Sequence, residues 1–264
     1  MTVLADARAA RAAGGWLLLW DIDGTLLLRA SRAHAEAVWA ALLEVHGLDR
    51  DALETRTGAG PKGAGMTDGQ IARLLLEAAG VDAAEIDAHA SRVRARTCEL
   101  YAPDDLTAHL NPGVDALLAE LHEREDVVQT LVTGNFEPVA RRKLEAAGIG
   151  RWFDATLGGG FGSDHEVRDH LPAIARTRVG AALRDDGAPW PAERTIVIGD
   201  TPRDIACARH DGVGVIAVAT GPHAVDELAD ADAVAEDVAT LRDVLLARLD
   251  APADRPPTGS PSTA

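Results

Sequence analysis

The sequence predicts an α/β fold with a doubly wound, mostly parallel sheet, because three apolar segments each end at a small or polar turn. The apolar run Trp16–Trp20 ends at an acidic turn, and the runs Asp126–Val132 and Arg194–Ile198 end at turns that precede a helix. Continuous apolar runs are typical of strands that are buried on both faces of a parallel sheet. Such sheets bind ligands at the carboxyl ends of their strands, where these three turns would meet.

The first turn, Asp21–Leu26, has the sequence DIDGTL and places two carboxylates two positions apart. Carboxylates crowded at one strand end repel each other, so they need a cation or a shared proton. Gly24 allows a tight turn and a close approach of the backbone to a ligand. The alternative is an Asp-rich turn that only ends a strand, but the two matching turns farther along the chain favour a site.

Residues 29–109 are predicted to form a mostly helical insertion. Apolar residues recur at helical spacing over 31–46, Thr67 opens a capping box for a helix that ends at Gly80, and a third helix covers 84–101. Asn111 is expected to cap the helix that restarts the core, with Pro112 at its first position. We therefore expect a core of residues 1–28 and 110–250, followed by a disordered Pro-, Ser- and Thr-rich tail over 251–264.

The remainder of the core is predicted to consist of short alternating elements. Strands are expected at 154–157, 215–218 and 232–234, a flexible loop at 158–162, and helices over 137–148 and 238–249 and from about Arg168 and Pro202. The sheet should then have five or six strands with helices on both faces.

Composition limits the possible partners and the cellular setting. The chain has 264 residues and a formal net charge of −16, which disfavours nucleic acids and anionic membranes as partners. Cys98 and Cys207 have no metal-ligand spacing, so a reducing cytoplasm is the expected setting, without a structural disulfide or a structural zinc site. The histidines show no ligand spacing either, and we expect them in surface or packing positions. The run Trp16–Trp20 is too short to span a membrane.

The three strand ends resemble the motifs of the haloacid dehalogenase superfamily of hydrolases, in its phosphoglycolate-phosphatase-like branch. The first motif, DxDGT and an apolar residue, matches Asp21–Leu26; the second, a Thr at the next strand end, matches Thr133; the fourth, GDxxxD, matches Gly199–Asp204. The resemblance covers residues from about Trp16 to Leu246. It implies a Rossmann-like core with a C1-type helical cap, here residues 29–109, which closes over the nucleophile and sets substrate choice.

The resemblance also implies a role for each matching residue. Asp21 would be the nucleophile that forms an aspartyl-phosphate, and Asp23 the acid and base that protonates the leaving alcohol and then activates water. Mg²⁺ would be held by the Asp21 carboxylate, the Asp23 backbone carbonyl, Asp200 and, through water or by supporting Asp200, Asp204. The phosphate would be held by Thr133, Gly134 and Asn135, together with Thr25, which would also brace the first loop.

The third motif of the family is a basic residue near the phosphate, and the sequence offers two candidates for it. Arg168 stands where the helix before the fourth strand would begin, and a guanidinium can bind phosphate through two hydrogen bonds. Lys143 lies on the helix after Thr133, beside Arg141 and Arg142, a position typical of a solvated helix face. We therefore expect Arg168 to be the phosphate-binding cation and keep Lys143 as the alternative.

These inferences predict a Mg²⁺-dependent phosphomonoesterase that acts on a small phosphorylated metabolite. A phosphomutase of the same fold shares the four motifs and stays open as an alternative. A 2-haloacid dehalogenase usually lacks the second acid of the first motif. A catalytically silent binding module would be expected to have lost Asp21, Asp23 or Asp200, and all three are present.

Overall fold

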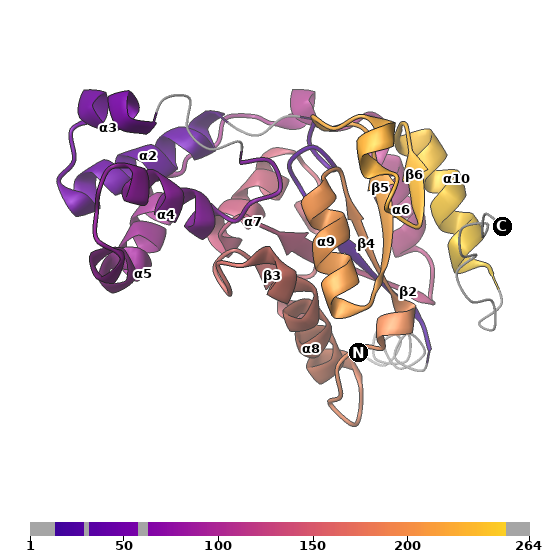
Figure 1. The fold of residues 1–264 in the computed structure, drawn as a ribbon. Coiled ribbons are helices and arrows are strands. Elements are labelled where there is room, and N and C mark those ends of the chain that lie inside the picture. The colour runs from indigo at the N-terminus through magenta and orange to yellow at the C-terminus, as the bar shows by residue number, and fades with distance from the viewer. Residues whose placement is uncertain (1–13, 29–31, 58–62, 252–264) are drawn as a thin grey trace, which may run out of the picture.

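The computed structural model describes residues 14–28, 32–57 and 63–251 and combines a parallel sheet, flanked by helices, with a helical bundle (Figure 1). The six strands follow the order β3-β2-β1-β4-β5-β6, and all pairs are parallel. This arrangement confirms the predicted doubly wound α/β class. The strands are β1 (Trp16–Trp20), β2 (Val127–Thr133), β3 (Gly159–Phe161), β4 (Thr195–Gly199), β5 (Gly214–Val218) and β6 (Ala233–Ala235).

The register of the central strands brings their carboxyl ends to one edge. Trp20, the last residue of β1, pairs with Leu131 of β2 and Ile198 of β4. The residues that follow these positions therefore emerge side by side, as expected for ligand-binding groups of an open α/β sheet. All five residues of β1 are buried, which explains why the strand is a continuous apolar run.

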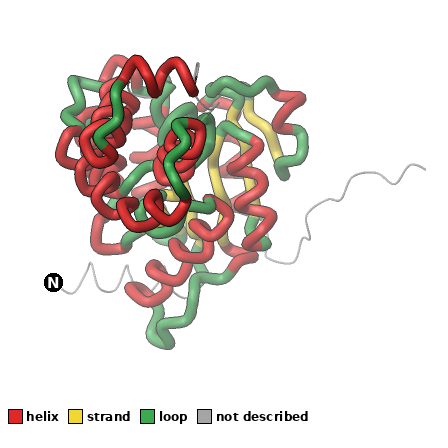
Figure 2. The backbone as a smooth tube through the Cα atoms, turned by 60° about the vertical axis from the view of Figure 1, so that its left-hand side comes forward, coloured by secondary structure: helices red, strands yellow, loops and turns green. Residues whose placement is uncertain are grey.

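Helices cover both faces of the sheet, because alternate side chains of each strand point to opposite sides. Leu18 and Trp20 belong to the core on one face, under α6 (Val114–His122), α7 (Glu137–Ala146) and α10 (Val238–Leu249). Leu17 and Leu19 belong to the core on the other face, under α8 (Leu171–Leu183) and α9 (Pro202–Asp211). Figure 2 shows the strands lying between these helices.

The insertion between β1 and β2 forms a bundle of helices with an apolar core of its own, which includes Val38, Leu75 and Val93. Its helices are α2 (Arg32–His46), α3 (Arg50–Thr57), α4 (Asp68–Ala78) and α5 (Ala83–Leu100). Figure 1 shows the bundle to one side of the sheet. The segment that leaves the core and the segment that returns to it lie side by side, because Leu27 and Leu110 form an antiparallel bridge. Among the described helices, none combines the length and apolar character needed to cross a bilayer.

The third strand lies later in the chain than the sequence predicts. Residues Ala155–Leu157 form a 3₁₀ turn, because the Asp154 carboxylate accepts hydrogen bonds from the backbone N–H (2.8 Å) and the hydroxyl (2.6 Å) of Thr156. The expected flexible loop instead contributes β3. Glycine suits this strand, since a Cβ at Gly160 would lie 2.2 Å from the carbonyl oxygen of Leu171. The predictions of a strand at 154–157 and a loop at 158–162 are therefore wrong.

Asn111 does not cap the helix that restarts the core. That helix, α6, begins at Val114 after Gly113, which has a φ of +87° and no side chain to cap it. The Asn111 amide instead donates to the carbonyl oxygen of Thr25 (2.8 Å) and to the hydroxyl of Thr220 (3.0 Å), tying the first loop to the far side of the site. The tail predicted over 251–264 lies outside the described residues from position 252 onward.

Candidate active site

Three buried acids meet at the carboxyl edge of the sheet. Asp21 follows β1 and Asp200 follows β4, while Asp204 lies in the first turn of α9; one carboxylate oxygen from each lies within 4.8 Å of the others. The start of α9 fixes Asp204, because Thr201 donates its backbone N–H (3.0 Å) and its hydroxyl (2.6 Å) to Oδ2 of that carboxylate.

The Asp200 side chain fits only because two glycines surround it. A Cβ at Gly24, whose φ is +98°, would lie 2.1 Å from Asp200 Oδ2, and a Cβ at Gly221 would lie 1.7 Å from the same atom. Thr25 donates its hydroxyl to Asp200 Oδ1 (3.0 Å), whereas Oδ2 is buried without a hydrogen-bond partner among the described residues. An oxygen-only donor set with one unmatched buried oxygen suits a hard divalent cation.

The electrostatics of these acids also favour a cation. Burial raises the pKa of Asp21 to about 6, with Arg168 opposing the shift and Asp204 adding to it. Burial, together with the carboxylates of Asp204 and Asp21, raises the pKa of Asp200 to about 9. Positive charge placed among the three would offset their mutual repulsion and return both groups toward the ionised form.

Asp23 faces a different partner. Its Oδ2 accepts hydrogen bonds from Lys143 Nζ (2.6 Å) and Asn135 Nδ2 (2.9 Å). Burial acts to raise the pKa of Asp23, but the Lys143 ammonium and these hydrogen bonds lower it on balance. The Asp23 carboxylate is thus separate from the group of three acids, and its predicted contribution to a metal site through the backbone carbonyl stays a prediction.

The interpretation of Lys143 as a solvated helix-face residue is wrong. Its side chain is fully buried, and its ammonium also donates to Asn135 Oδ1 (2.6 Å). The sequence did carry a signal: Val139, Ala140 and Leu144 are buried on the same helix, so Lys143 lies four residues after Val139 on the apolar stripe. A lysine on such a stripe indicates a buried partner, which here is Asp23.

Arg168 also reaches the site. It is buried, its Nη2 lies 3.0 Å from Asp21 Oδ1, and the same nitrogen donates to Asp204 Oδ1. Its Nη1 donates to the carbonyl oxygen of Gly65 in the insertion (3.1 Å). Arg168 lies in a 3₁₀ turn directly before α8, rather than in the helix itself. The structure therefore brings both candidate cations to the site, one against each acid of the first motif.

The turn after β2 supplies the groups predicted to hold phosphate. Thr133 is fully buried, and its hydroxyl oxygen accepts from the Asn135 amide (2.8 Å). The insertion closes on this turn, because the backbone N–H of Asp68 donates to the carbonyl oxygen of Gly134 (2.8 Å). A Cβ at Gly134 would lie 2.1 Å from the carbonyl oxygen of Met66, so only glycine permits this approach. Their roles toward phosphate stay predictions.

A cavity of about 620 Å³ lies between the sheet edge and the insertion. The core lines it with acids and with the turn after β2, whereas the insertion contributes mainly apolar side chains. Those side chains are Ala35, Val38, Trp39, Met66 and Ile71. Gly63, Ala64 and Gly65, from the glycine-rich segment of the insertion, line the same cavity.

Two polar residues of the insertion, neither of them predicted as a site residue, also line the cavity. His34 Nε2 lies 3.0 Å from Asp68 Oδ2, which also accepts the backbone N–H of Phe136 (2.8 Å). Asp68 therefore connects the insertion to the start of α7. Its place in the first turn of a helix gave a weak hint, but nothing in the sequence pattern pairs it with His34.

Comparison with known proteins agrees with this geometry. The family model for haloacid dehalogenase-like hydrolase matches residues 18–209. The chain is 28% identical to a Dickeya dadantii protein named "Probable phosphatase IndB", over 82% of this chain and 86% of that one. It is 30% identical to a phosphoglycolate phosphatase of Rhodospirillum rubrum, over 86% and 90%. The crystal structure of a hydrolase from Pseudomonas syringae shares the fold, with a TM-score of 0.60 and 21% identity over 88% of this chain and 98% of that one.

Proposed function

This chain belongs to the haloacid dehalogenase-like hydrolase family, and from that premise we propose that it hydrolyses phosphoric monoesters of small metabolites through an aspartyl-phosphate on Asp21. One observation carries the proposal. A buried carboxylate with a raised pKa, two buried cations and a group of acids suited to a metal ion lie at one sheet edge beside the cavity. The names of the two curated relatives support a phosphatase over the other reactions of the fold.

Asp21 is suited to attack phosphorus because it is held in place. Arg168 Nη2, 3.0 Å from Asp21 Oδ1, fixes the direction of the carboxylate. In the first step an Asp21 oxygen forms a bond to phosphorus while the bond from phosphorus to the ester oxygen breaks. The backbone N–H groups of Gly134 and Asn135, with the Thr133 hydroxyl, would donate to the other phosphate oxygens.

Asp23 would move the protons of both steps, and Lys143 controls its ionisation. The lowered pKa of Asp23 favours the carboxylate, which is the form that activates water to hydrolyse the aspartyl-phosphate. To protonate the leaving alcohol in the first step, the carboxyl must hold a proton. Lys143 Nζ, 2.6 Å from Asp23, would need to turn toward the incoming phosphate to permit this.

The metal ion is proposed to be Mg²⁺, held by Asp21, Asp200 and Asp204. When bound, it would supply positive charge that offsets the charge of the phosphate and of the three acids. The fit rests on the unmatched Asp200 oxygen and on Gly24 and Gly221, whose lack of a side chain lets that carboxylate lie at the sheet edge. Oxygen-only ligands favour Mg²⁺ over softer metals.

The cavity suggests the class of ester. Its volume of about 620 Å³ is in the range of small-molecule pockets. The wall opposite the acids is apolar, with Trp39 and Ile71, and its polar groups are His34 and Asp68. We propose an ester whose alcohol part is largely apolar or aromatic and carries one hydrogen-bonding group.

Phosphate release from a panel of aryl, sugar and carboxylate-bearing phosphate esters tests the proposal, with Mg²⁺ and with EDTA. The wild type should release phosphate only with the metal, and Asp21→Asn should release none. Asp243→Asn, which changes an exposed carboxylate, is the matched control and should retain full activity. Phosphate release that persists in Asp21→Asn would overturn the assigned nucleophile. Transfer of the phosphoryl group between sugar hydroxyls without release would instead support a phosphomutase.

A further inference from the structure

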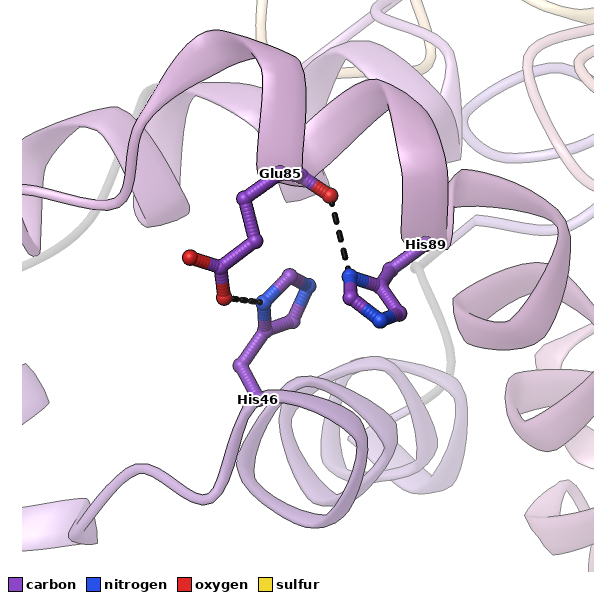
Figure 3. Close-up of side chains that lie close together, drawn as sticks. All are labelled: His46, Glu85 and His89. Atoms are coloured by element: carbon purple, nitrogen blue, oxygen red, sulfur yellow. Dashed lines mark hydrogen bonds and ion pairs between the residues drawn. The ribbon is translucent and has the colours of Figure 1, made fainter.

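Two imidazoles and a carboxylate lie together between α2 and α5, away from the cavity. His46 ends α2, while Glu85 and His89 stand four residues apart on α5 and so share one face of that helix. One ligand atom from each residue lies within 4.8 Å of the others, and the two imidazole centroids are 5.3 Å apart. Figure 3 shows the two rings side by side near the Glu85 carboxylate, and their planes are inclined at 75° in an edge-to-face arrangement. We propose that these three residues bind a divalent late transition metal such as Zn²⁺.

The hydrogen bonds of the cluster engage the Nδ1 atom of each imidazole and leave the Nε2 atom of each ring for a ligand. His46 Nδ1 lies 3.2 Å from Glu85 Oε1, and His89 Nδ1 lies 3.1 Å from the backbone carbonyl oxygen of Glu85. Both oxygens can only accept, so each Nδ1 carries the proton and each Nε2 keeps a lone pair. The bond from His89 to a backbone carbonyl is one that metal-binding histidines commonly make with their other ring N–H.

The second nitrogen of His46 is an independent indication of a ligand. The His46 side chain is fully buried, and its Nε2 has no hydrogen-bond partner among the described residues. A buried polar atom without a partner is costly, and such atoms in native proteins often mark an ion or water. In Figure 3 this nitrogen lies on the side of the ring that faces His89.

The donor set indicates the class of metal. Imidazole nitrogens suit zinc, copper and nickel. Two histidines with one carboxylate form a known ligand set for Zn²⁺ that leaves a position for water, and Glu85 would complete this set once its carboxylate turns away from His46 Nδ1. The Glu85 side chain is half exposed, so an ion can enter from solvent. Sequence spacing did not reveal the cluster, because His46 lies 39 positions before Glu85 and only the packing of α2 on α5 joins them.

A metal bound at this site would stabilise the insertion and would not take part in the reaction at the sheet edge. A metal held by one residue of α2 and two of α5 ties the two helices together. His34, which lines the cavity, lies twelve positions before His46 on the same helix, or about 18 Å away at the rise of an α-helix. Metal binding would therefore stabilise the helix that carries His34 without reaching the acids.

Calorimetric titration of Zn²⁺ into the full chain tests this proposal, in saturating Mg²⁺ so that the acids of the sheet edge are occupied. The wild type should bind one Zn²⁺, and His89→Ala and Glu85→Gln should each weaken that binding by more than about tenfold. His210→Ala is the matched control, because His210 belongs to a separate histidine cluster with His165 and His170 and should leave zinc binding unchanged.

Thermal unfolding in EDTA accompanies the titration and shows whether each variant is folded without metal. His89 is partly exposed, so His89→Ala should unfold at the wild-type temperature in EDTA and lose only the rise in Tm that Zn²⁺ gives the wild type. No zinc binding by the wild type, unchanged affinity in folded His89→Ala, or loss of affinity in His210→Ala would each overturn the assignment.

Discussion

Replacing Asp200 with Asn should stabilise the metal-free protein while it abolishes phosphatase activity. In the folded chain, burial and the neighbouring acids raise the pKa of Asp200 to about 9, against an ordinary value of 3.8. At pH 7 the unfolded chain has lost this proton and the folded chain keeps it, so folding is penalised. Each pH unit above 3.8 costs about 1.36 kcal/mol, which amounts to about 4 kcal/mol at pH 7.

The pH dependence separates this penalty from other effects of the substitution. Because the raised pKa belongs to an acid, the penalty is absent below about pH 4, grows as the pH rises and levels off above about pH 9. The amide introduced by Asp200→Asn can still accept the Thr25 hydroxyl, but its N–H₂ group could cost about 1–3 kcal/mol if it finds no acceptor. That cost does not change with pH. The advantage of the variant should therefore grow by about 3 kcal/mol between pH 5 and pH 7.

Urea unfolding in EDTA at pH 5 and pH 7, followed by circular dichroism, measures this difference. Adding Mg²⁺ at pH 7 should raise the unfolding free energy of the wild type and leave that of Asp200→Asn unchanged, since binding to the folded state alone stabilises it. Asp243→Asn, which changes an exposed carboxylate, should show no pH-dependent advantage. A stability difference between Asp200→Asn and wild type that is the same at both pH values would refute the reasoning.

Three further predictions concern Lys143, the contact between Gly134 and the insertion, and the nucleophile Asp21. Lys143→Met should lower the unfolding free energy by about 1–3 kcal/mol, because it leaves the partly buried Asp23 carboxylate without its cation, and it should lower kcat at least about 100-fold. Exposed Arg151→Met should change neither quantity; urea unfolding and phosphate release measure both. Gly134→Ala should raise KM because its Cβ would lie 2.1 Å from a backbone oxygen of the insertion, while Gly69→Ala, with its nearest contact at 3.5 Å, should not, as steady-state kinetics will show. Activity should fall below about pH 6, because Asp21 then takes up a proton. In pH–rate profiles this fall in activity should move to lower pH as the Mg²⁺ concentration is raised. A fall at the same pH at every Mg²⁺ concentration would contradict a site in which Asp21 binds the metal.

Local sequence patterns were sufficient to predict the three central strands of the sheet and the acids at their carboxyl ends. Trp16–Trp20 is short and apolar throughout, which favours a buried strand, and a polar residue directly after such a strand emerges at its end. The same reasoning located Thr133 and Asp200. Parallel pairing in register then brought the three strand ends together, which is why local patterns sufficed for this part of the candidate site.

Which side chains are buried, and which groups they contact, depends on how the elements pack. Lys143 is buried because the site, with Asp23, lies against its helix face, and no local rule states what will pack there. The strand β3 lies at a run of glycines. The backbone of Leu171 comes so close to Gly160 that a residue with a Cβ would not fit there. His34 contacts Asp68, and His46 contacts Glu85, although many residues separate the partners along the chain. Spacing along the chain determines the face on which a residue lies, but contacts between distant segments depend on how those faces pack, and packing is a property of the whole fold.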